Sequence, residues 1–435
     1  MKSFPMTRRF GLILAAATAL SACAVLPWSA HHAEAAAPSA AAKSDQVVIL
    51  IGVDGLRPDA LERYPDATPN IRALAADGVT AEGMTPAMPS LTFVNFYSLA
   101  TGLYADHTGI VSNWSYSRKL GRVMGRADHG ESVWWGGEPI WVTAEKQGVH
   151  TGTMFWLGSE AAIEGVRPSH WLPFDPNLPY ADRVKTVLGW LAGPDHPRFL
   201  TIYFQGVDSA EHQFGVGTPE ERGAIVDADA AVGALIDGVK QLGLADKTNF
   251  ILVSDHGMAN VPSGNIIDLD DFISFDDVFI PVFQGPDGAG VSAIVNIFVK
   301  KGGVDAIYDN LSQASARSHF KVYRREHLPA RWHMNNPDRT GDVVVVADEG
   351  WLLWGRSLVS HYEGGPPKGM HGYDRNLPSM QATFIAEGPR FRDGIVVEPF
   401  DNVEVYGMIA NILGLKPAKT DGDLSHVAYF MKPAR

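Results

Sequence analysis

Continuous runs of apolar residues mark the strands that this chain is expected to form. Residues 47–53 read VVILIGV and contain no polar side chain. Such a run suits a central strand of a parallel sheet, which is buried on both faces. Further strands are predicted at 198–204, 249–254, 341–347 and 380–386.

Helix signals lie between these runs. Prolines stand at the predicted first turns and glycines directly after the predicted last turns, as is typical of helix starts and stops. Helices are predicted at 69–77, at 93–100, from 219 onward, and at 403–413. Strands that alternate with helices indicate the α/β class, with a central, mostly parallel sheet that carries helices on both faces.

Two regions depart from this alternation. Residues 114–180 are rich in tryptophan and glycine and are expected to form an irregular cap. Residues 260–340 are expected to form an α+β insertion, in which His327 and His333 are interpreted as structural or surface residues. We predict that residues 45–435 form one domain that contains both regions.

The first 44 residues have the pattern of an export signal followed by a low-complexity linker. Basic residues precede an apolar, alanine-rich run over 10–25, and small residues at 33–37 offer cleavage positions. The run is too short for a confident membrane span, so no transmembrane helix is expected in the mature chain. The chain is therefore expected to be exported, as a periplasmic or membrane-anchored protein.

Cys23 is the only cysteine, and it lies in the sequence Leu-Ser-Ala-Cys. This sequence resembles a bacterial lipobox, in which the cysteine receives a lipid anchor. The alternative is a small residue of a signal segment that is cleaved near residues 33–37. With either outcome the mature chain has no internal disulfide, so its stability must come from packing and bound metal.

Composition and net charge limit the classes of function that this chain can have. The hydrophobic share of 46% and the charged share of 20% are typical of a soluble globular protein. The net charge of −13 argues against stable binding of nucleic acid, which requires a basic surface. A small nucleotide in a locally positive, metal-bearing pocket remains compatible with this charge.

Thr92 is expected at or near the amino end of the helix over 93–100. Unpaired N–H groups make that end positive. The hydroxyl could be a plain helix cap, or it could be a nucleophile whose oxyanion the helix end and a metal stabilise.

Carboxylates and imidazoles follow the predicted strands or lie in loops. They are Asp54, Asp208, His212, Asp255, His256 and His371. Each has an ordinary interpretation too, as a turn residue or a surface histidine, and the Asp208–His212 spacing alone is a weak signal. Mixed carboxylate and imidazole ligands without thiolates suit zinc, and six ligands fit two ions. Two such ions suit phosphoryl transfer.

The chain resembles the nucleotide pyrophosphatase/phosphodiesterase family of the alkaline phosphatase superfamily. The resemblance extends over about residues 47–424. It rests on the blocks IGVDG, PSLTFVN, TGLYADHTGIVSN, WWGGEPIWVTAEKQG, YFQGVDSAEH, VSDHGM, MHGYD and PFDNVEVY, in that order.

The resemblance implies roles for individual residues. Thr92 matches the nucleophile. One zinc is expected to be held by Asp208, His212 and His371, and the other by Asp54, Asp255 and His256 with the Thr92 oxygen. Asn113 matches a residue that hydrogen-bonds a phosphate oxygen, although Asn113-Trp114-Ser115 also matches a glycosylation sequon, which an export signal of bacterial type disfavours.

Phe93 matches one side of a slot for the nucleobase, and Phe174 is expected at the other side, where relatives have tyrosine. The chain departs from the family around the nucleophile, because Leu91, Val94 and Phe96 replace a lysine, a proline and a histidine. The ligands and Thr92 are retained, so we expect hydrolysis to be retained and substrate preference to differ.

The expected function is therefore hydrolysis of nucleotide-type phosphodiesters or pyrophosphates to 5′-monophosphates, by two zinc ions and a phospho-threonine intermediate. Alternatives are a phosphodiesterase for lipid-like or other organic diesters, a phosphomonoesterase of the same superfamily, and a metal-dependent binding protein at the cell surface. A sulfatase is disfavoured because no cysteine lies near Thr92. Manganese or iron could replace zinc in such a site.

Overall fold

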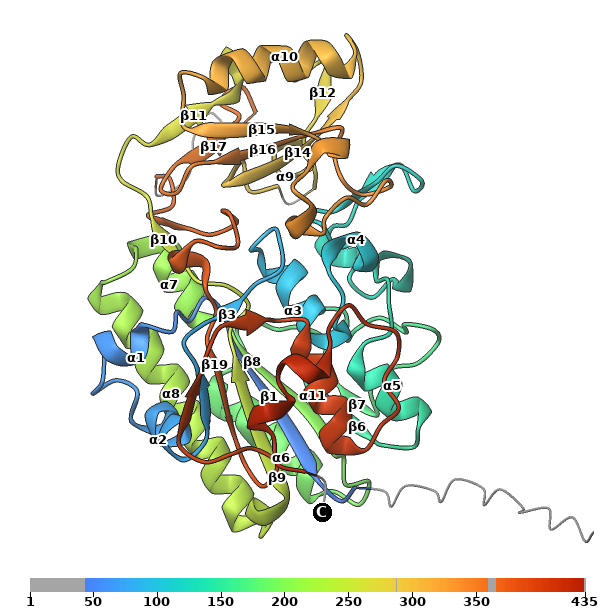
Figure 1. Ribbon diagram of the computed structural model, residues 1–435, viewed down its shortest axis with the longest axis vertical. Helices are drawn as coiled ribbons and strands as arrows, with labels where there is room; N and C mark the ends of the chain where they lie inside the picture. Colours follow the sequence, from blue (N-terminus) through green and yellow to red (C-terminus); the bar gives the residue numbers. More distant parts are fainter. Residues whose placement is uncertain (1–43, 287, 359–364, 434–435) are drawn as a thin grey trace, which may run out of the picture. The chain divides into compact units, whose positions relative to one another are not determined.

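The computed structural model describes residues 44–286, 288–358 and 365–433 (Figure 1). The predicted export signal, with Cys23 and the cleavage positions, lies outside these residues. Within the described ranges, no helix has both the length and the apolar character needed to cross a membrane.

An eight-stranded sheet organises the larger part of the fold. Its strands are, in spatial order, β20 (Ile395–Val397), β2 (Val79–Ala81), β19 (Phe384–Glu387), β9 (Thr248–Val253), β1 (Val47–Val53), β8 (Phe199–Phe204), β6 (Thr151–Met154) and β7 (His170–Trp171). The central strand β1 is parallel to both β8 and β9, and all seven of its residues are buried, as its apolar run predicts. Only β19 reverses direction, since it is antiparallel to both β9 and β2.

Helices cover both faces of this sheet (Figure 1). One group is α2 (Pro69–Asp77), α6 (Tyr180–Ala192), α7 (Gly206–Phe214) and α8 (Pro219–Gln241), in which α8 packs against the other three. The other group is α3 (Thr92–Thr101), α5 (Ile140–Lys146) and α11 (Glu404–Leu413), which pack against one another. The predicted α/β class is confirmed.

A second group of strands lies between β9 and β19 in the chain and has a separate hydrophobic core. A four-stranded antiparallel sheet has the order β12 (Val278–Phe279), β14 (Ile294–Val299), β16 (Val343–Ala347) and β15 (Phe320–Arg324), and α10 (Val304–Ser315) packs on it. A three-stranded sheet consists of β11 (Ile266–Asp268), β17 (Leu352–Trp354) and β13 (Val291–Ser292).

The remaining elements are short. Strand pairs are β3 (Met84–Thr85) with β21 (Phe400–Asp401), β4 (Tyr116–Ser117) with β5 (Arg122–Val123), and β10 (Ala259–Asn260) with β18 (Gly369–Met370). Single-turn helices are α1 (Ala60–Arg63), α4 (Ala105–Thr108) and α9 (Pro281–Gln284).

The structure differs from the expected boundaries at four places. Residues 114–180 contain α5, β6 and β7, so part of the expected cap belongs to the main sheet. The strand β16 pairs with β14 and β15, so the α+β portion extends beyond residue 340. The strand predicted at 380–386 begins at Phe384, because residues 378–380 form a 3-10 turn that starts with proline, and a further sheet strand, β20, follows it in the chain. Thr68 precedes α2 but bonds the carbonyl of Tyr64 and does not cap the helix.

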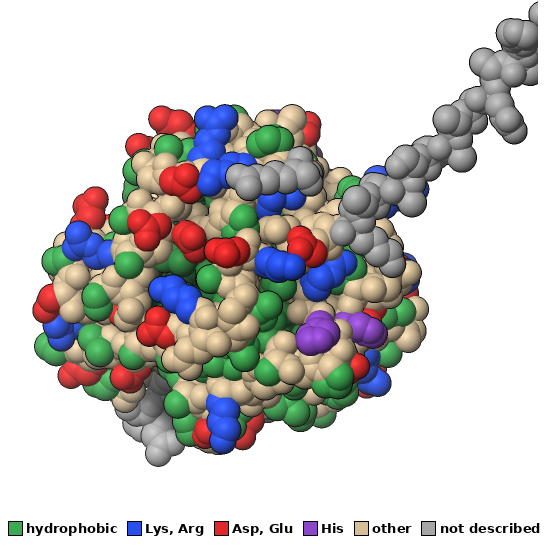
Figure 2. All heavy atoms as spheres, turned by 90° about the horizontal axis from the view of Figure 1, so that it is seen from below, with side chains coloured by type: hydrophobic (Ala, Val, Ile, Leu, Met, Phe, Trp, Pro, Cys, Tyr) green, Lys and Arg blue, Asp and Glu red, His purple; other side chains and the backbone are tan. Residues whose placement is uncertain are grey.

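Figure 2 shows the surface seen from below relative to Figure 1. Acidic and basic side chains are interspersed on this face and do not form one continuous basic surface. Such a surface offers no extended match to a phosphate backbone.

Candidate functional site

The parallel strands place four predicted ligands at one edge of the sheet. Asp54 directly follows β1, and Asp255 and His256 follow β9 after one residue. Asp208 lies in the first turn of α7, which begins two residues after β8. Because the carboxyl ends of parallel strands meet at the same edge, residues 200 positions apart in the chain become neighbours. Asp54, Asp255 and His256 are buried there, each at most 2% exposed.

His212 and His371 complete the group. His212 lies one helical turn after Asp208 on α7, and its Nε2 atom is 3.4 Å from Asp208 Oδ1. His371 follows β18, which pairs with β10 just beyond the β9 end. Its Nε2 atom lies 3.1 Å from that of His212 and 3.6 Å from Asp208 Oδ1. His371, for which the sequence also allowed a surface position, is therefore a buried member of the cluster.

All three imidazoles are oriented by the main chain. The Nδ1 atoms of His212, His256 and His371 each lie 2.9 Å from a backbone carbonyl, those of Gly369, Gly257 and Ser90 respectively. A carbonyl only accepts hydrogen bonds, so each Nδ1 carries the proton. Each Nε2 atom then faces the carboxylates, and in a neutral imidazole it offers a lone pair there. This is how histidines that bind metal are held in place.

The ligand atoms form two overlapping groups. Asp208, His212 and His371 lie within 4.8 Å of one another, and so do Asp54, Asp208 and His256. The first group is the predicted ligand set of one ion. In the second, Asp208 stands where the resemblance implies Asp255. Asp255 nevertheless reaches the same imidazole, since its Oδ2 atom is 2.8 Å from His256 Nε2.

The cluster concentrates negative charge away from water. Burial and the nearby charges of Asp255 and Asp208 raise the pKa of Asp54 well above its ordinary value. Burial alone would lower the pKa of His256, but Asp255 and Asp208 raise it on balance. Burial, with His256 and His212 beside it, lowers the pKa of His371 well below its ordinary value, so His371 is neutral. Buried carboxylates and imidazoles whose pKa values are shifted in this way are typical of a metal centre.

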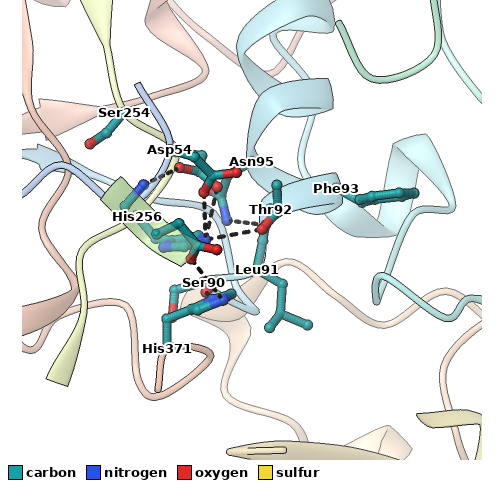
Figure 3. A network of polar contacts seen from close by, with 12 residues as sticks. Asp54, Ser90, Leu91, Thr92, Phe93, Asn95, Ser254, His256 and His371 are labelled. Carbon is teal, nitrogen blue, oxygen red and sulfur yellow. Dashed lines mark hydrogen bonds and ion pairs between the residues drawn. The ribbon is translucent and has the colours of Figure 1, made fainter. Parts of the chain in front are cut away.

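Thr92 is the first residue of α3, and Leu91 is the cap residue before it. Leu91 and not Thr92 occupies the capping position, so the interpretation of Thr92 as a helix cap is wrong. Its Oγ1 atom lies 3.2 Å from His256 Nε2 and faces Asp54 and His256 (Figure 3). The hydroxyl therefore sits between the positive end of a helix and the ligand cluster.

Asn113 lies beside the same helix end. Its side-chain Oδ1 atom accepts a hydrogen bond of 3.0 Å from the backbone N–H of Phe93. This bond fixes the orientation of the amide, so that the Nδ2 group is the end left to donate to a ligand. The Asn113 side chain also lines the pocket that contains His212 and His371.

The two residues predicted to hold the nucleobase, Phe93 and Phe174, pack against different aromatic side chains. The Phe93 ring packs edge-on against His129 at 5.0 Å and stacks near Trp135 at 6.4 Å. The Phe174 ring is 45% exposed and contacts Phe155 at 5.2 Å and Tyr203 at 5.9 Å. That a base lies between them remains a prediction.

Two residues that position the site were missed by the sequence analysis. Tyr203, in β8, donates its hydroxyl hydrogen bond to Asp54 Oδ2. Asn95, in the apolar run of α3, donates to the carbonyls of Pro89 and Leu91 at 3.0 and 2.9 Å and accepts from the N–H of Ala87. It thereby holds the loop that leads to Thr92. A polar residue in the middle of an apolar helix was the available signal.

A third group of possible ligands lies elsewhere, at Asp106, His107 and Asp421. His107 Nδ1 is already bonded to Asp421 at 2.8 Å, and its side chain is 58% exposed. An ordinary surface ion pair accounts for this contact.

Residues 48–374 match the family "Type I phosphodiesterase / nucleotide pyrophosphatase". The chain is 34% identical over 387 residues to a venom phosphodiesterase of Naja atra, and 35% identical over 387 residues to ectonucleotide pyrophosphatase/phosphodiesterase family member 3 of Bos taurus. Each match covers 87% of this chain but only 46% and 44% of those relatives, so the chain spans about half of their length.

A solved structure shares this fold over its whole length. Murine ectonucleotide pyrophosphatase/phosphodiesterase 5 superposes with a TM-score of 0.82 at 29% identity, over 89% of this chain and 100% of the murine one. The family match over residues 48–374 includes the segments that carry Asp54, Thr92, Asp208 and His256. The chain has the alkaline phosphatase-like fold and belongs to the type I phosphodiesterase/nucleotide pyrophosphatase family.

Proposed function

We propose that the protein is a zinc-dependent hydrolase that cleaves nucleotide-type phosphodiesters or pyrophosphates to 5′-monophosphates through a phospho-threonine at Thr92. The observation that carries the proposal is the orientation of the three imidazoles, whose Nε2 atoms converge on three carboxylates next to the Thr92 hydroxyl. Such a preformed set of ligands beside a hydroxyl at a helix amino end serves phosphoryl transfer.

The residues fit two divalent cations. Within the ligand cluster, three buried carboxylate oxygens have no hydrogen-bond partner: Asp54 Oδ1, Asp208 Oδ1 and Asp255 Oδ2. A buried carboxylate without partners is costly unless a cation offsets its charge. We assign one ion to Asp208, His212 and His371. The other is assigned to Asp54, Asp255 and His256 with the Thr92 oxygen, and Asp208 lies within reach of both.

When bound, two zinc ions supply positive charge that lowers the pKa of a coordinated hydroxyl and offsets the charge on the phosphate. The Thr92 oxygen attacks phosphorus, so that the Oγ1–P bond forms while the bond to the leaving oxygen breaks. The Thr92 hydroxyl loses its proton in this step, and the leaving oxygen takes up one proton. The Asn113 Nδ2 group donates to a phosphate oxygen, and the positive amino end of α3 faces the same charge. Water then cleaves the Oγ1–P bond, releases the monophosphate and restores the hydroxyl.

The relatives support this assignment. A second structure of the murine protein is described as an inactive threonine-to-alanine variant in complex with AMP, with a TM-score of 0.82 to this chain. A threonine required for activity and a nucleoside monophosphate as ligand are what the proposed reaction implies for Thr92 and for its product.

The test compares Thr92→Ala with wild type after both are loaded with zinc. We expect kcat/KM on the nitrophenyl ester of a nucleoside monophosphate to fall by roughly 10³-fold or more, because the attacking atom is removed. The zinc content, measured by atomic absorption, should remain close to that of wild type, because six other ligands remain. Thr92→Ser is the matched control and should retain measurable turnover. Full activity of Thr92→Ala would refute the covalent mechanism.

Intact-mass spectrometry of acid-quenched reactions tests the intermediate directly. A phosphoryl or nucleotidyl adduct should appear on wild type and be absent from Thr92→Ala. An adduct on another residue would reassign the nucleophile.

We also propose that the chain is exported, with residues 45–435 as one folded domain and with Cys23 as a possible lipid anchor. The signal pattern of residues 1–44 supports this proposal. Metabolic labelling with a fatty acid, with Cys23→Ala as the control, tests the anchor.

A further inference from the structure

A pocket of about 420 Å³ opens from the ligand cluster on the side of Asp208, His212 and His371. This volume lies within the range of roughly 300–1,000 Å³ that is typical of small-molecule sites. Its lining includes Asn113, His212 and His371, so the pocket begins where the phosphate is expected to bind. It continues past Leu91 and Trp114 toward residues of the second group of strands.

Phe93 is not part of this pocket. Leu91 and Phe93 flank Thr92 in the sequence, and their side chains extend from the helix end in different directions (Figure 3). Leu91 lines the pocket, whereas Phe93 packs against His129 and Trp135. A phosphodiester has two substituents on phosphorus, and the Leu91 and Phe93 side chains lie in two different directions from Thr92 (Figure 3). If the base lies against Phe93, the substituent that departs enters the pocket beside Leu91.

The described residues that line the pocket carry almost no charge. Apart from Asn113, His212 and His371, the described residues that line it are Leu91, Trp114, Ser209, Gln213, Ala289, Val291, Ser292, Gly365, Pro366, Pro367 and Met370. None of these is lysine, arginine, aspartate or glutamate. Bound phosphates depend on charge-assisted bonds, and beyond the metal ligands these described residues offer no countercharge to a polyanion such as pyrophosphate. The aromatic, aliphatic and proline side chains suit an uncharged group with an apolar or aromatic face.

We propose that this pocket receives the leaving group and selects uncharged alcohols with an apolar or aromatic body over pyrophosphate. The inference rests on the proposed function. It makes the protein a phosphodiesterase for nucleotides esterified to such alcohols, with nucleoside triphosphates as poor substrates.

The experiment uses two substrates that both yield AMP, so that only the leaving group differs. They are ATP and the nitrophenyl ester of AMP, and kcat/KM is measured for each with the zinc-loaded protein. We expect the value for ATP to be at least tenfold lower. Since the two leaving groups also differ in intrinsic reactivity, charge variants of the pocket decide the origin of the preference.

Gln213 is the position for these variants, because it lines the pocket and is exposed on α7, so substitution there does not threaten folding. Gln213→Lys should raise the ratio of kcat/KM for ATP to that for the nitrophenyl ester by about fivefold or more. Gln213→Glu should lower the same ratio. Leu91→Lys, with Leu91→Met as the neutral control, repeats the test at a second, more buried lining residue.

A wild-type preference for ATP, or a ratio that is the same in Gln213→Lys and Gln213→Glu, would overturn the inference while leaving the proposed function intact. Failure of the proposed function has a different result: neither substrate would be cleaved by wild type faster than by Thr92→Ala.

Discussion

The hydrogen bond between Asn113 and Phe93 gives the most detailed prediction. Asn113 Oδ1 accepts a hydrogen bond from the Phe93 N–H, which lies in the first turn of α3, where amides have no carbonyl partner within the helix. The Nδ2 group is then the only part of the side chain that can donate to a phosphate. We therefore propose two functions for this one side chain, helix capping and transition-state stabilisation, and two substitutions separate them.

Asn113→Ala removes both functions. Loss of a donor to a developing oxyanion costs about 2.7–4 kcal/mol, so kcat/KM should fall about 10²- to 10³-fold. Loss of the acceptor for the Phe93 N–H costs about 1 kcal/mol of stability. With about 2.1 cal/mol/K of unfolding entropy per residue, this corresponds to a decrease of about 1 °C in Tm for a domain of this size.

Asn113→Asp keeps the acceptor and replaces the donor with a negative charge. Its Tm should stay at or above that of wild type, because a carboxylate at a helix amino end is favourable. Its activity should be lower than that of Asn113→Ala, since a charge about 6 Å from the phosphate repels it by about 3 kcal/mol at an effective dielectric constant of about 20.

The assay for both variants is kcat/KM on the nitrophenyl ester of a nucleoside monophosphate, together with calorimetric Tm and zinc content. If Asn113→Asp were the more active of the two variants, or if Asn113→Ala kept wild-type activity, the assigned orientation of the amide would be refuted.

Three further predictions concern the ligands and the slot. With metal removed by a chelator, Asp54→Asn should be more stable than wild type at pH 8, and this difference in stability should shrink toward pH 5. The pKa of Asp54 is raised in the folded state, so folding favours the protonated carboxyl, and the stability of the wild type is lost as pH rises. A Tm difference that is independent of pH would contradict this. Tyr203→Phe removes the donor to Asp54 and should weaken zinc affinity about 10- to 100-fold, as measured by chelator competition, and unchanged affinity would show that the bond is dispensable. Phe93→Ala should raise KM for a nucleotide ester roughly 5- to 150-fold more than KM for a diester without a base, because loss of base stacking costs about 1–3 kcal/mol of binding free energy. An equal effect on both substrates would exclude stacking on Phe93.

Local features of the chain were readable without the fold. The apolar run of β1, the proline at the start of α8 and the glycine after α3 specify elements through neighbouring residues alone, and the structure has these elements where the pattern predicts them. Asp255 and His256 are adjacent, and Asp208 and His212 are one helical turn apart. Their proximity therefore follows from chain geometry.

Contacts between distant segments were decided only by tertiary structure. The run at β16 looks like a strand of the main sheet, but it pairs with β14 and β15, because an apolar run does not specify its partner. His371 is oriented in the site by the hydrogen bond from its Nδ1 atom to the carbonyl of Ser90, which lies 281 residues away in the chain. Asp208 comes within reach of both ligand groups because β1 and β8 are adjacent. Burial and hydrogen-bond partners at such places depend on the whole fold, and they determine which carboxylates need a cation.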